Sequence, residues 1–316
     1  MTRNNALICD EPKVTILMGV WNGAAHLPVQ LDSIARQSHR NWHLICSDDG
    51  STDDSTGILR RFASDHPGQV RLINGPGQGF SQNFMSMIAA LSDDAGYVCF
   101  SDQDDMWHPR KVAQALKRLQ VSDSRARLYC GRHHYWYPHR GYCAPSAKRL
   151  RPCGLQNALI ENVASGNTIM LNPAATALAR QGVLRTGLVF AHDWWLYLLI
   201  TACGGEVYFD NDEPLIWYRQ HDANAIGAGR GWAMQTQRKI GVLKGLFRNR
   251  VQSNLDALNA VNDMLTPQAR RLIADFAAAR QSGGFERLRA LRALGAYRQG
   301  WIGHLGYWGA ASIGRV

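Results

Sequence analysis

Short apolar runs alternate with amphipathic segments along the first 120 residues of the chain. The amphipathic segments predict helices, because apolar residues such as Leu27, Leu31 and Ile34 recur on one helical face. The apolar runs predict strands at 14–20, 42–47, 70–74 and 97–101, and the first, which is rich in β-branched residues, predicts a buried strand. Strands that alternate with helices form parallel sheets through right-handed crossovers, so this half predicts an α/β, Rossmann-like fold with a mostly parallel sheet.

Three further helices are predicted between and after these strands. One carries Ile58, Leu59 and Phe62, with Ser51 and Thr52 as candidate N-caps. The others cover about 80–91 and the segment from Lys111 to Leu119.

Beyond about residue 125 the pattern is less regular. Segments 128–137 and 164–172 resemble strands, a buried helix begins near His192, and 207–221 resembles a closing hairpin. From about 230 onward the chain is helical, arginine-rich and amphipathic.

Polar residues follow the four predicted strands at the points where these strands end. They are Asn22, Asp49, the glycine-rich segment 75–79 and Asp102. Ligands of open parallel sheets bind beyond the carboxyl ends of the strands, so these residues predict a binding site at one edge.

The stretch FSDQDDMWHPRK crowds Asp102, Asp104 and Asp105 into four positions after the fourth strand. Two carboxylates 4 Å apart repel each other by roughly 4 kcal/mol at an effective dielectric of 20, unless a cation neutralises them. The Asp-x-Asp pair suits a hard divalent cation, whose shell phosphate oxygens and water complete. Asp105 alone is equally consistent with an acidic helix cap ahead of Pro109.

The other polar segments each allow two interpretations. In DDGSTDDS (48–55) the acids either cap a helix or accept hydrogen bonds from a pyrimidine or a ribose. GPGQGFSQNF either cradles phosphate or only connects a strand to a helix; it matches neither a Walker motif nor a dinucleotide fingerprint.

Asp193, in AHDWWL, lies beside two tryptophans. Such surroundings raise a carboxyl pKa and favour a general base, although Asp193 is also a good N-cap by residue type. His221 in YRQH is either a metal ligand or a structural histidine.

Composition indicates a folded protein, with 46% hydrophobic and 19% charged residues. We expect no membrane span, no signal peptide, and a reducing cytoplasm for the seven unpaired-looking cysteines. Residues 1–229 carry 21 basic and 21 acidic side chains, whereas 230–316 carry 14 and four. The chain is therefore divided into a neutral body and a basic C-terminal region.

The basic region, with Trp301, Tyr307 and Trp308 near its end, suits an anionic membrane surface. A solvated helical face or an oligomer contact is the alternative. Nucleic-acid binding is not expected, because the chain has no zinc-ligand spacing or RNA-binding signature.

Residues 13–227 carry an ordered set of motifs. They are VTILMGVWNGAAHLPVQLDSIARQS, SDDGSTDDS, NFMSMIAAL, FSDQDDMWHPRKV, SGNTIMLN, HDWW and YRQHDANAIG. This set resembles the inverting glycosyltransferases of family 2, which have the GT-A fold, and in particular bacterial rhamnosyltransferase-like members. The resemblance implies a nucleotide-binding half at about 13–120, an acceptor half at about 121–229 and a C-terminal extension.

The same resemblance implies roles for individual residues. Gly19, Val20, Asn22 and Asp49 would contact the nucleobase, and Asp193 would deprotonate the acceptor hydroxyl. The remaining implied site residues are Asn83 in the donor site, Asp102 at the ribose or metal, Asp104 on Mg²⁺ or Mn²⁺, Arg219 at the leaving group and His221 at the metal or diphosphate.

Two positions depart from the family pattern. Trp21 replaces the usual tyrosine before Asn-Gly, and Gln82 stands where many members have arginine. The QxxRW motif of processive synthases is absent, which implies transfer of a single sugar. The implied reaction moves L-rhamnose from dTDP-rhamnose to a glycan or polyprenyl-linked acceptor at the inner membrane face; another hexose from a UDP-sugar, or a non-catalytic nucleotide-sugar-binding module, is the alternative.

Overall fold

The computed structural model describes residues 11–221 and 245–316, and its centre is a seven-stranded sheet. The strand order is β10-β6-β9-β4-β1-β2-β3. Neighbouring strands are parallel except at β9, which is antiparallel to both β4 and β6. The bounds are β1 Val14–Val20, β2 Trp42–Asp48, β3 Val70–Asn74, β4 Tyr97–Ser101, β6 Arg127–Gly131, β9 Met170–Leu171 and β10 Glu206–Asp210.

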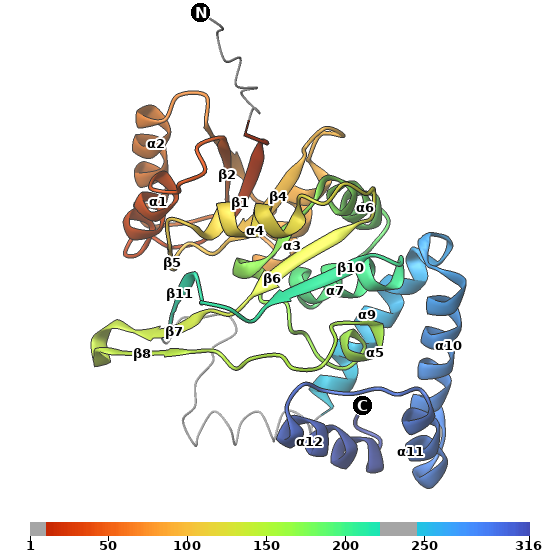
Figure 1. Cartoon of the computed structure of the whole chain (residues 1–316). Coiled ribbons are helices and arrows are strands. Elements are labelled where there is room, and N and C mark those ends of the chain that lie inside the picture. Colours follow the sequence, from red (N-terminus) through yellow and green to blue (C-terminus); the bar gives the residue numbers. More distant parts are fainter. Residues whose placement is uncertain (1–10, 222–244) are drawn as a thin grey trace, which may run out of the picture.

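The predicted first half of this sheet is confirmed almost residue for residue. β1, β3 and β4 have the predicted bounds, and β2 extends one residue further, to Asp48. Helices flank these strands (Figure 1). β1 and β4 are buried almost throughout, as their apolar sequences require, whereas no residue of β3, at the edge of the sheet, is fully buried. The connecting helices are α1 Leu27–Ala35, α2 Ser55–Asp65, α3 Phe80–Ala89 and α4 Lys111–Leu119.

The predicted N-caps of α2 are wrong. The N-cap residue is Asp54, and Ser51 instead donates its hydroxyl to Asp48 and accepts the backbone N–H of Asn22. Ser51 therefore joins the ends of β1 and β2 to each other.

A second, four-stranded sheet has the order β5-β11-β7-β8. Its strands are β5 Met106–Trp107, β7 His134–Tyr137, β8 Tyr142–Pro145 and β11 Ile216–Arg219. Three predictions made for this part of the chain are corrected. The run 128–137 is divided between the two sheets, and 164–172 forms a 3₁₀ turn (η2, Gly166–Thr168) and the two-residue β9.

The predicted hairpin over 207–221 is also wrong, because β10 pairs with β6 in the large sheet and β11 pairs with β5 and β7 in the small one. β10 ends at Asp210, whose carboxylate accepts the N–H of Asp212 and the hydroxyl of Tyr129.

Helix α7, His192–Ala202, is the most buried helix of the described residues, and nine of its eleven residues are buried. A helix that is apolar on all sides must be covered on all sides. α5 Leu155–Ala158, α6 Pro173–Val183 and the C-terminal helices contribute to that cover.

The C-terminal helices are α9 Leu246–Ala260, α10 Pro267–Gln281, α11 Gly284–Ala293 and α12 Trp301–Ser312. They lie beside α5 and α7, on the side of the molecule away from α1 and α2 (Figure 1), and Leu258 and Phe276 belong to the same apolar cluster as α7. No helix in the described ranges is both long and apolar enough to cross a bilayer. The predicted boundary at 229 lies outside the described residues, so the division into two regions stays a prediction.

Candidate active site

The acidic loop after β4 lies close to the start of α7. Burial, followed by the negative charges of Asp104 and Asp193, raises the pKa of Asp102 from 3.8 to about 7. The Asp102 carboxylate accepts no hydrogen bond from any residue that the structure describes. Asp102, Asp104 and Asp193 therefore share one site, although Asp193 follows Asp102 by 91 positions.

Asp104 is held by the segment that ends β11. Its Oδ2 lies 2.7 Å from Nε2 of His221, and its backbone carbonyl accepts a 2.8 Å hydrogen bond from Nε of Arg219. The Arg219 guanidinium also lies 4.1 Å from the ring centroid of Trp136 on β7. The ring of His26, which precedes α1, lies 4.9 Å from that of His221. The end of β11 and the segment after it thus bring the guanidinium of Arg219 and the imidazole of His221 against the acidic loop, with the His26 ring beside them.

Asp105 is not an acidic helix cap. It is fully buried; its Oδ2 accepts a 2.6 Å hydrogen bond from Nδ2 of Asn167, and its Oδ1 accepts the N–H of Arg219 at 3.2 Å. Burial, with the charges of Asp102 and Asp104, raises the pKa of this carboxyl well above its usual value. α4 begins only at Lys111, after Arg110 as its N-cap residue. Asp105 therefore fixes the acidic loop to η2 and β11.

Lys111, which the sequence analysis did not identify as a site residue, supplies a buried cation near the acidic loop. Its ammonium lies 3.3 Å from the ring centroid of Trp107, and burial lowers its pKa from 10.5 to about 8 despite the attraction of Cys99, Asp105 and Asp102. A lysine at the first position of the helix that follows the acidic loop is the sequence signal that could have revealed it.

Asp193 occupies the first turn of α7 but is not the N-cap, which is Ala191. Its carboxylate accepts the N–H of Trp194 at 2.6 Å and that of Gly166 at 3.1 Å, and it is also hydrogen-bonded by the Asn162 side chain. Burial outweighs these hydrogen bonds and raises its pKa from 3.8 to about 6. A carboxylate with that pKa is well suited to accept a proton near neutral pH.

The loop between β1 and α1 is joined to the loop between β2 and α2. Asn22 has a positive φ of 47°, the only such residue besides glycine in the described part of the chain. Its side-chain oxygen accepts the N–H of Thr52 at 2.8 Å, and its own N–H binds Ser51. Gly19 and Val20 are the last residues of β1, opposite Ser47 and Asp48 of β2. The side chain of Trp21, which follows them, is 61% exposed.

Asp49 anchors the glycine-rich loop. Its Oδ1 accepts the N–H of Gly77 at 2.7 Å, and its Oδ2 accepts that of Gly79 at 2.8 Å. A Cβ at Gly75 would lie 2.6 Å from Oδ1 of Asp49, so the close approach requires glycine there. The glycine-rich loop, which follows β3, is therefore held by a carboxylate that follows β2.

Asn83 is buried at the start of α3. Its amide pairs with Ser47 of β2: Nδ2 donates to the Ser47 carbonyl at 2.9 Å, and Oδ1 accepts the Ser47 hydroxyl at 2.5 Å. These hydrogen bonds fasten α3 to the sheet, and the role of Asn83 in the donor site stays a prediction.

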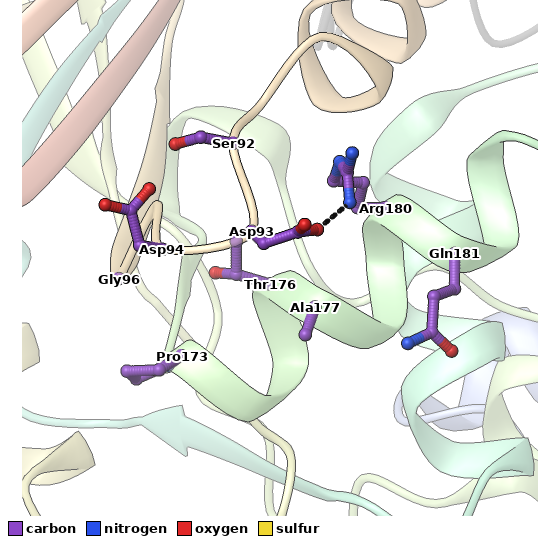
Figure 2. Close-up of a pocket in the computed structure, with 9 residues that line it drawn as sticks. All are labelled: Ser92, Asp93, Asp94, Gly96, Pro173, Thr176, Ala177, Arg180 and Gln181. Carbon is purple, nitrogen blue, oxygen red and sulfur yellow. Dashed lines mark hydrogen bonds and ion pairs between the residues drawn. The ribbon is translucent and has the colours of Figure 1, made fainter.

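A cavity of about 160 Å³ lies elsewhere, near the residues that precede β4 (Figure 2). Its lining includes Thr176 and the ion pair of Asp93 with Arg180. Because β4 begins there and the acidic loop follows the other end of the strand, this cavity is separate from the candidate active site.

Among the described residues, no group of three His, Cys, Asp or Glu side chains is arranged to hold a metal ion. Asp102 and Asp104 nevertheless suit Mg²⁺ or Mn²⁺, because these ions take one or two carboxylates and complete their shell with substrate phosphates and water. The Asp102 carboxylate, which accepts no hydrogen bond within the described ranges, fits that requirement.

Comparison with known proteins identifies the family of this chain. Residues 15–172, half of the chain, match the family described as Glycosyl transferase family 2. The chain belongs to glycosyl transferase family 2. The dTDP-rhamnosyl transferase RfbG of Shigella flexneri is 26% identical over 241 residues, which are 74% of this chain and 80% of that protein.

Solved structures of glycosyltransferases share the GT-A fold. S. aureus TarS 1-349 in complex with UDP-GlcNAc is 13% identical, with a TM-score of 0.55 over 96% of this chain and 89% of that one. The mannosyltransferase PcManGT of Pyrobaculum calidifontis, in complex with GDP-Man and Mn²⁺, is 19% identical, with a TM-score of 0.51 over 96% of this chain and 87% of that one. This family 2 protein is therefore a glycosyltransferase of the GT-A fold.

Proposed function

We propose that the enzyme transfers one sugar from a nucleoside diphosphate donor to an acceptor hydroxyl, with inversion at the anomeric carbon. The observation that carries this proposal is the placement of Asp193. Its carboxylate, with a pKa raised to about 6, acts electrostatically on Asp102 in the acidic loop. A proton acceptor thus stands beside a group suited to bind the donor.

The donor nucleotide lies against the loops after β1 and β2 in this proposal. Trp21 offers an exposed ring for the base, Gly19, Val20 and Asn22 are its neighbours along the chain, and Asp49 holds the glycine-rich loop. L-Rhamnose from dTDP-rhamnose is the proposed donor sugar. The similarity to a dTDP-rhamnosyl transferase over three quarters of the chain supports this choice.

Asp102 and Asp104 would hold Mg²⁺ or Mn²⁺ together with the donor diphosphate, and His221, whose Nε2 lies 2.7 Å from Asp104, would contact the diphosphate. The ion, when bound, supplies Lewis-acid stabilisation of the negative charge on the departing diphosphate. PcManGT, which has the same fold, was solved with Mn²⁺ and GDP-Man. Arg219, fixed by Asp104 and Trp136, adds a positive charge toward the leaving group.

Asp193 performs the proton transfer. Its carboxylate takes the acceptor hydroxyl proton as that oxygen forms a bond to the anomeric carbon. The bond between the anomeric carbon and the diphosphate oxygen breaks on the opposite face, and the electron pair leaves with the nucleoside diphosphate. Gly166, Asn162 and the N–H of Trp194 orient the carboxylate through the hydrogen bonds described above.

The proposed acceptor is a glycan or a polyprenyl-linked glycan, used in cell-surface polysaccharide synthesis at the cytoplasmic face of the membrane. A groove of about 470 Å³, which none of the candidate site residues lines, is the proposed contact for a more distant part of the glycan. It lies between α9 and the segment that leads into α7, and its polar lining includes Asn249, Gln252 and Asp256. Side chains of this kind form hydrogen bonds with sugar hydroxyls.

The Asp193→Asn variant tests the proposal. It removes the proton acceptor but keeps the size of the side chain, so we expect transfer to be abolished while nucleotide affinity stays nearly unchanged. Binding of dTDP-, UDP- and GDP-sugars with and without Mn²⁺ then identifies the donor. Transfer that survives in the variant would place the base elsewhere, and a preference for UDP-hexoses would contradict the rhamnose assignment.

A further inference from the structure

Helix α12 presents an uncharged, apolar face to solvent. Trp301 is 73% exposed and Leu305 is 61% exposed, and Ile302 and Ile313 are also exposed. Trp301, Ile302 and Leu305 share one face of the helix, and Ile313 follows as its C-cap residue, while Tyr307, Ala310 and Ala311 are buried on the other face. We call the four exposed residues Trp301, Ile302, Leu305 and Ile313 the α12 face.

Positive charge lies on the segments next to α12. Residues 284–316 contain five arginines and one glutamate, and α12 itself contains no Lys, Arg, Asp or Glu. Arg289 and Arg292 on the neighbouring α11, and Arg315 just after α12, are exposed. An apolar helical face with an aromatic residue at one end and arginines next to it is typical of helices that lie in the interface of an anionic bilayer.

The length of the helix supports a position in the bilayer surface. Twelve residues form a helix about 18 Å long, which is far short of the roughly 30 Å of a hydrocarbon core. A second copy of the chain is a less suitable partner for this face. Symmetric contact would bring the arginine groups of two copies together and oppose association.

The segment that leads into α12 is attached to the acceptor side of the active site. The N–H of Gln299 donates to Glu161 at 2.6 Å, and the carbonyl of Tyr297 accepts Nδ2 of Asn157 at 2.9 Å. The next residue after Glu161 is Asn162, whose side chain is hydrogen-bonded to Asp193. A surface that engages α12 is therefore connected to the catalytic base through one short segment.

We propose that the α12 face docks on the surface of an anionic lipid bilayer and holds the acceptor side of the enzyme against it. This inference rests on the proposed function, because it identifies the partner that carries the lipid-linked acceptor. The occupant is the bilayer itself: the apolar side chains enter its interface, and the arginines pair with lipid phosphates.

Sedimentation of the full-length protein with vesicles tests the proposal. The vesicles are phosphatidylcholine alone or phosphatidylcholine with phosphatidylglycerol. Leu305→Glu places a negative charge on the α12 face, and Leu184→Glu is the matched control, because Leu184 is 62% exposed at the end of α6. We expect binding to the anionic vesicles only, a loss of about tenfold in Leu305→Glu, and no change in Leu184→Glu.

Three results would overturn the proposal: equal binding of Leu305→Glu and the wild type, equal binding to both kinds of vesicle, or no binding at all. Light scattering tests for a second copy. A wild-type dimer that Leu305→Glu converts to a monomer, with vesicle binding unchanged, would replace the bilayer by another subunit.

Release of nucleoside diphosphate from the sugar donor, measured without vesicles, separates this inference from the proposed function. Leu305→Glu is distant in sequence from the donor residues, so we expect unchanged release. A wild-type protein that binds vesicles but releases no nucleotide would contradict the proposed function and leave the docking surface standing. A protein that releases nucleotide from donors but does not bind vesicles would contradict the docking surface and leave the proposed function standing.

Discussion

The side-chain amide of Gln103 forms two hydrogen bonds with the backbone of Trp21. Its Oε1 accepts the Trp21 N–H and its Nε2 donates to the Trp21 carbonyl, both at 2.9 Å. Gly23 makes room for this arrangement, because a Cβ at that position would overlap the Gln103 side chain. The middle residue of the Asp-x-Asp sequence thus ties the acidic loop to the loop after β1.

Replacement of Gln103 by alanine should weaken donor binding more than it slows the chemical step. Two hydrogen bonds, each contributing about 0.5–1.5 kcal/mol, correspond to an increase in donor KM of roughly 5- to 150-fold, with a much smaller change in kcat. Steady-state kinetics at saturating acceptor measure both quantities. Gln120→Ala, at the exposed end of α4, is the control and should match the wild type. A loss of the same size in kcat, with no change in KM, would show that the hydrogen bonds of Gln103 to Trp21 do not position the donor.

The pH dependence of transfer should report the pKa of Asp193. The raised pKa of about 6 means that the carboxyl is protonated, and inactive as a base, below that pH. We expect kcat/KM to fall as the pH decreases through about 6, by about tenfold per unit at the acid end. An acid limb centred near the ordinary Asp value of about 4 would contradict this assignment.

Asp104→Ala should reduce donor binding only when the metal is present. The carboxylate is one of the two oxygen ligands expected for Mg²⁺ or Mn²⁺, so its loss should remove most of the gain in affinity that Mn²⁺ gives the wild type. Calorimetric titration of the nucleotide with and without Mn²⁺ measures this gain. If the variant keeps the full gain, or if EDTA leaves wild-type transfer unchanged, the acidic loop does not hold a metal.

Asp105→Ala should destabilise the fold. The buried carboxyl joins the acidic loop to Asn167 and to the N–H of Arg219, and both donors would be left without it. We expect the free energy of unfolding to fall by about 2–4 kcal/mol, measured by urea denaturation. Asp65→Ala, at the exposed end of α2, should change it by less than about 0.5 kcal/mol. A stability equal to that of the wild type would mean that Asp105 does not fix the loop.

The parallel half of the fold could be predicted because its signals are local. Each of β1, β2, β3 and β4 is a continuous apolar run followed by an amphipathic helix, and both periodicities are visible without knowledge of distant residues. The second sheet could not be predicted in this way. β5 has two residues and β11 has four, and they are ordered by each other across more than 100 positions.

The candidate site shows the same division. Asp102, Asp104 and Asp193 could be found because carboxylates at strand ends and beside tryptophans are unusual in sequence. Asn162, Asn167 and Gln103 were missed, because an ordinary amide acquires its role only from partners 31, 62 and 82 positions away. The burial of Asn83 against Ser47 was missed for the same reason.

The link from Glu161 to Gln299 has a consequence for the order in which the enzyme matures. The two residues are 138 positions apart, whereas the loops after β1 and β2 are joined across about 30. A chain emerging from the ribosome can complete its nucleotide end long before the segment beside the base is fastened. A chain that ends before Gln299 would therefore keep the joined loops after β1 and β2 but lack the contact that fastens Glu161.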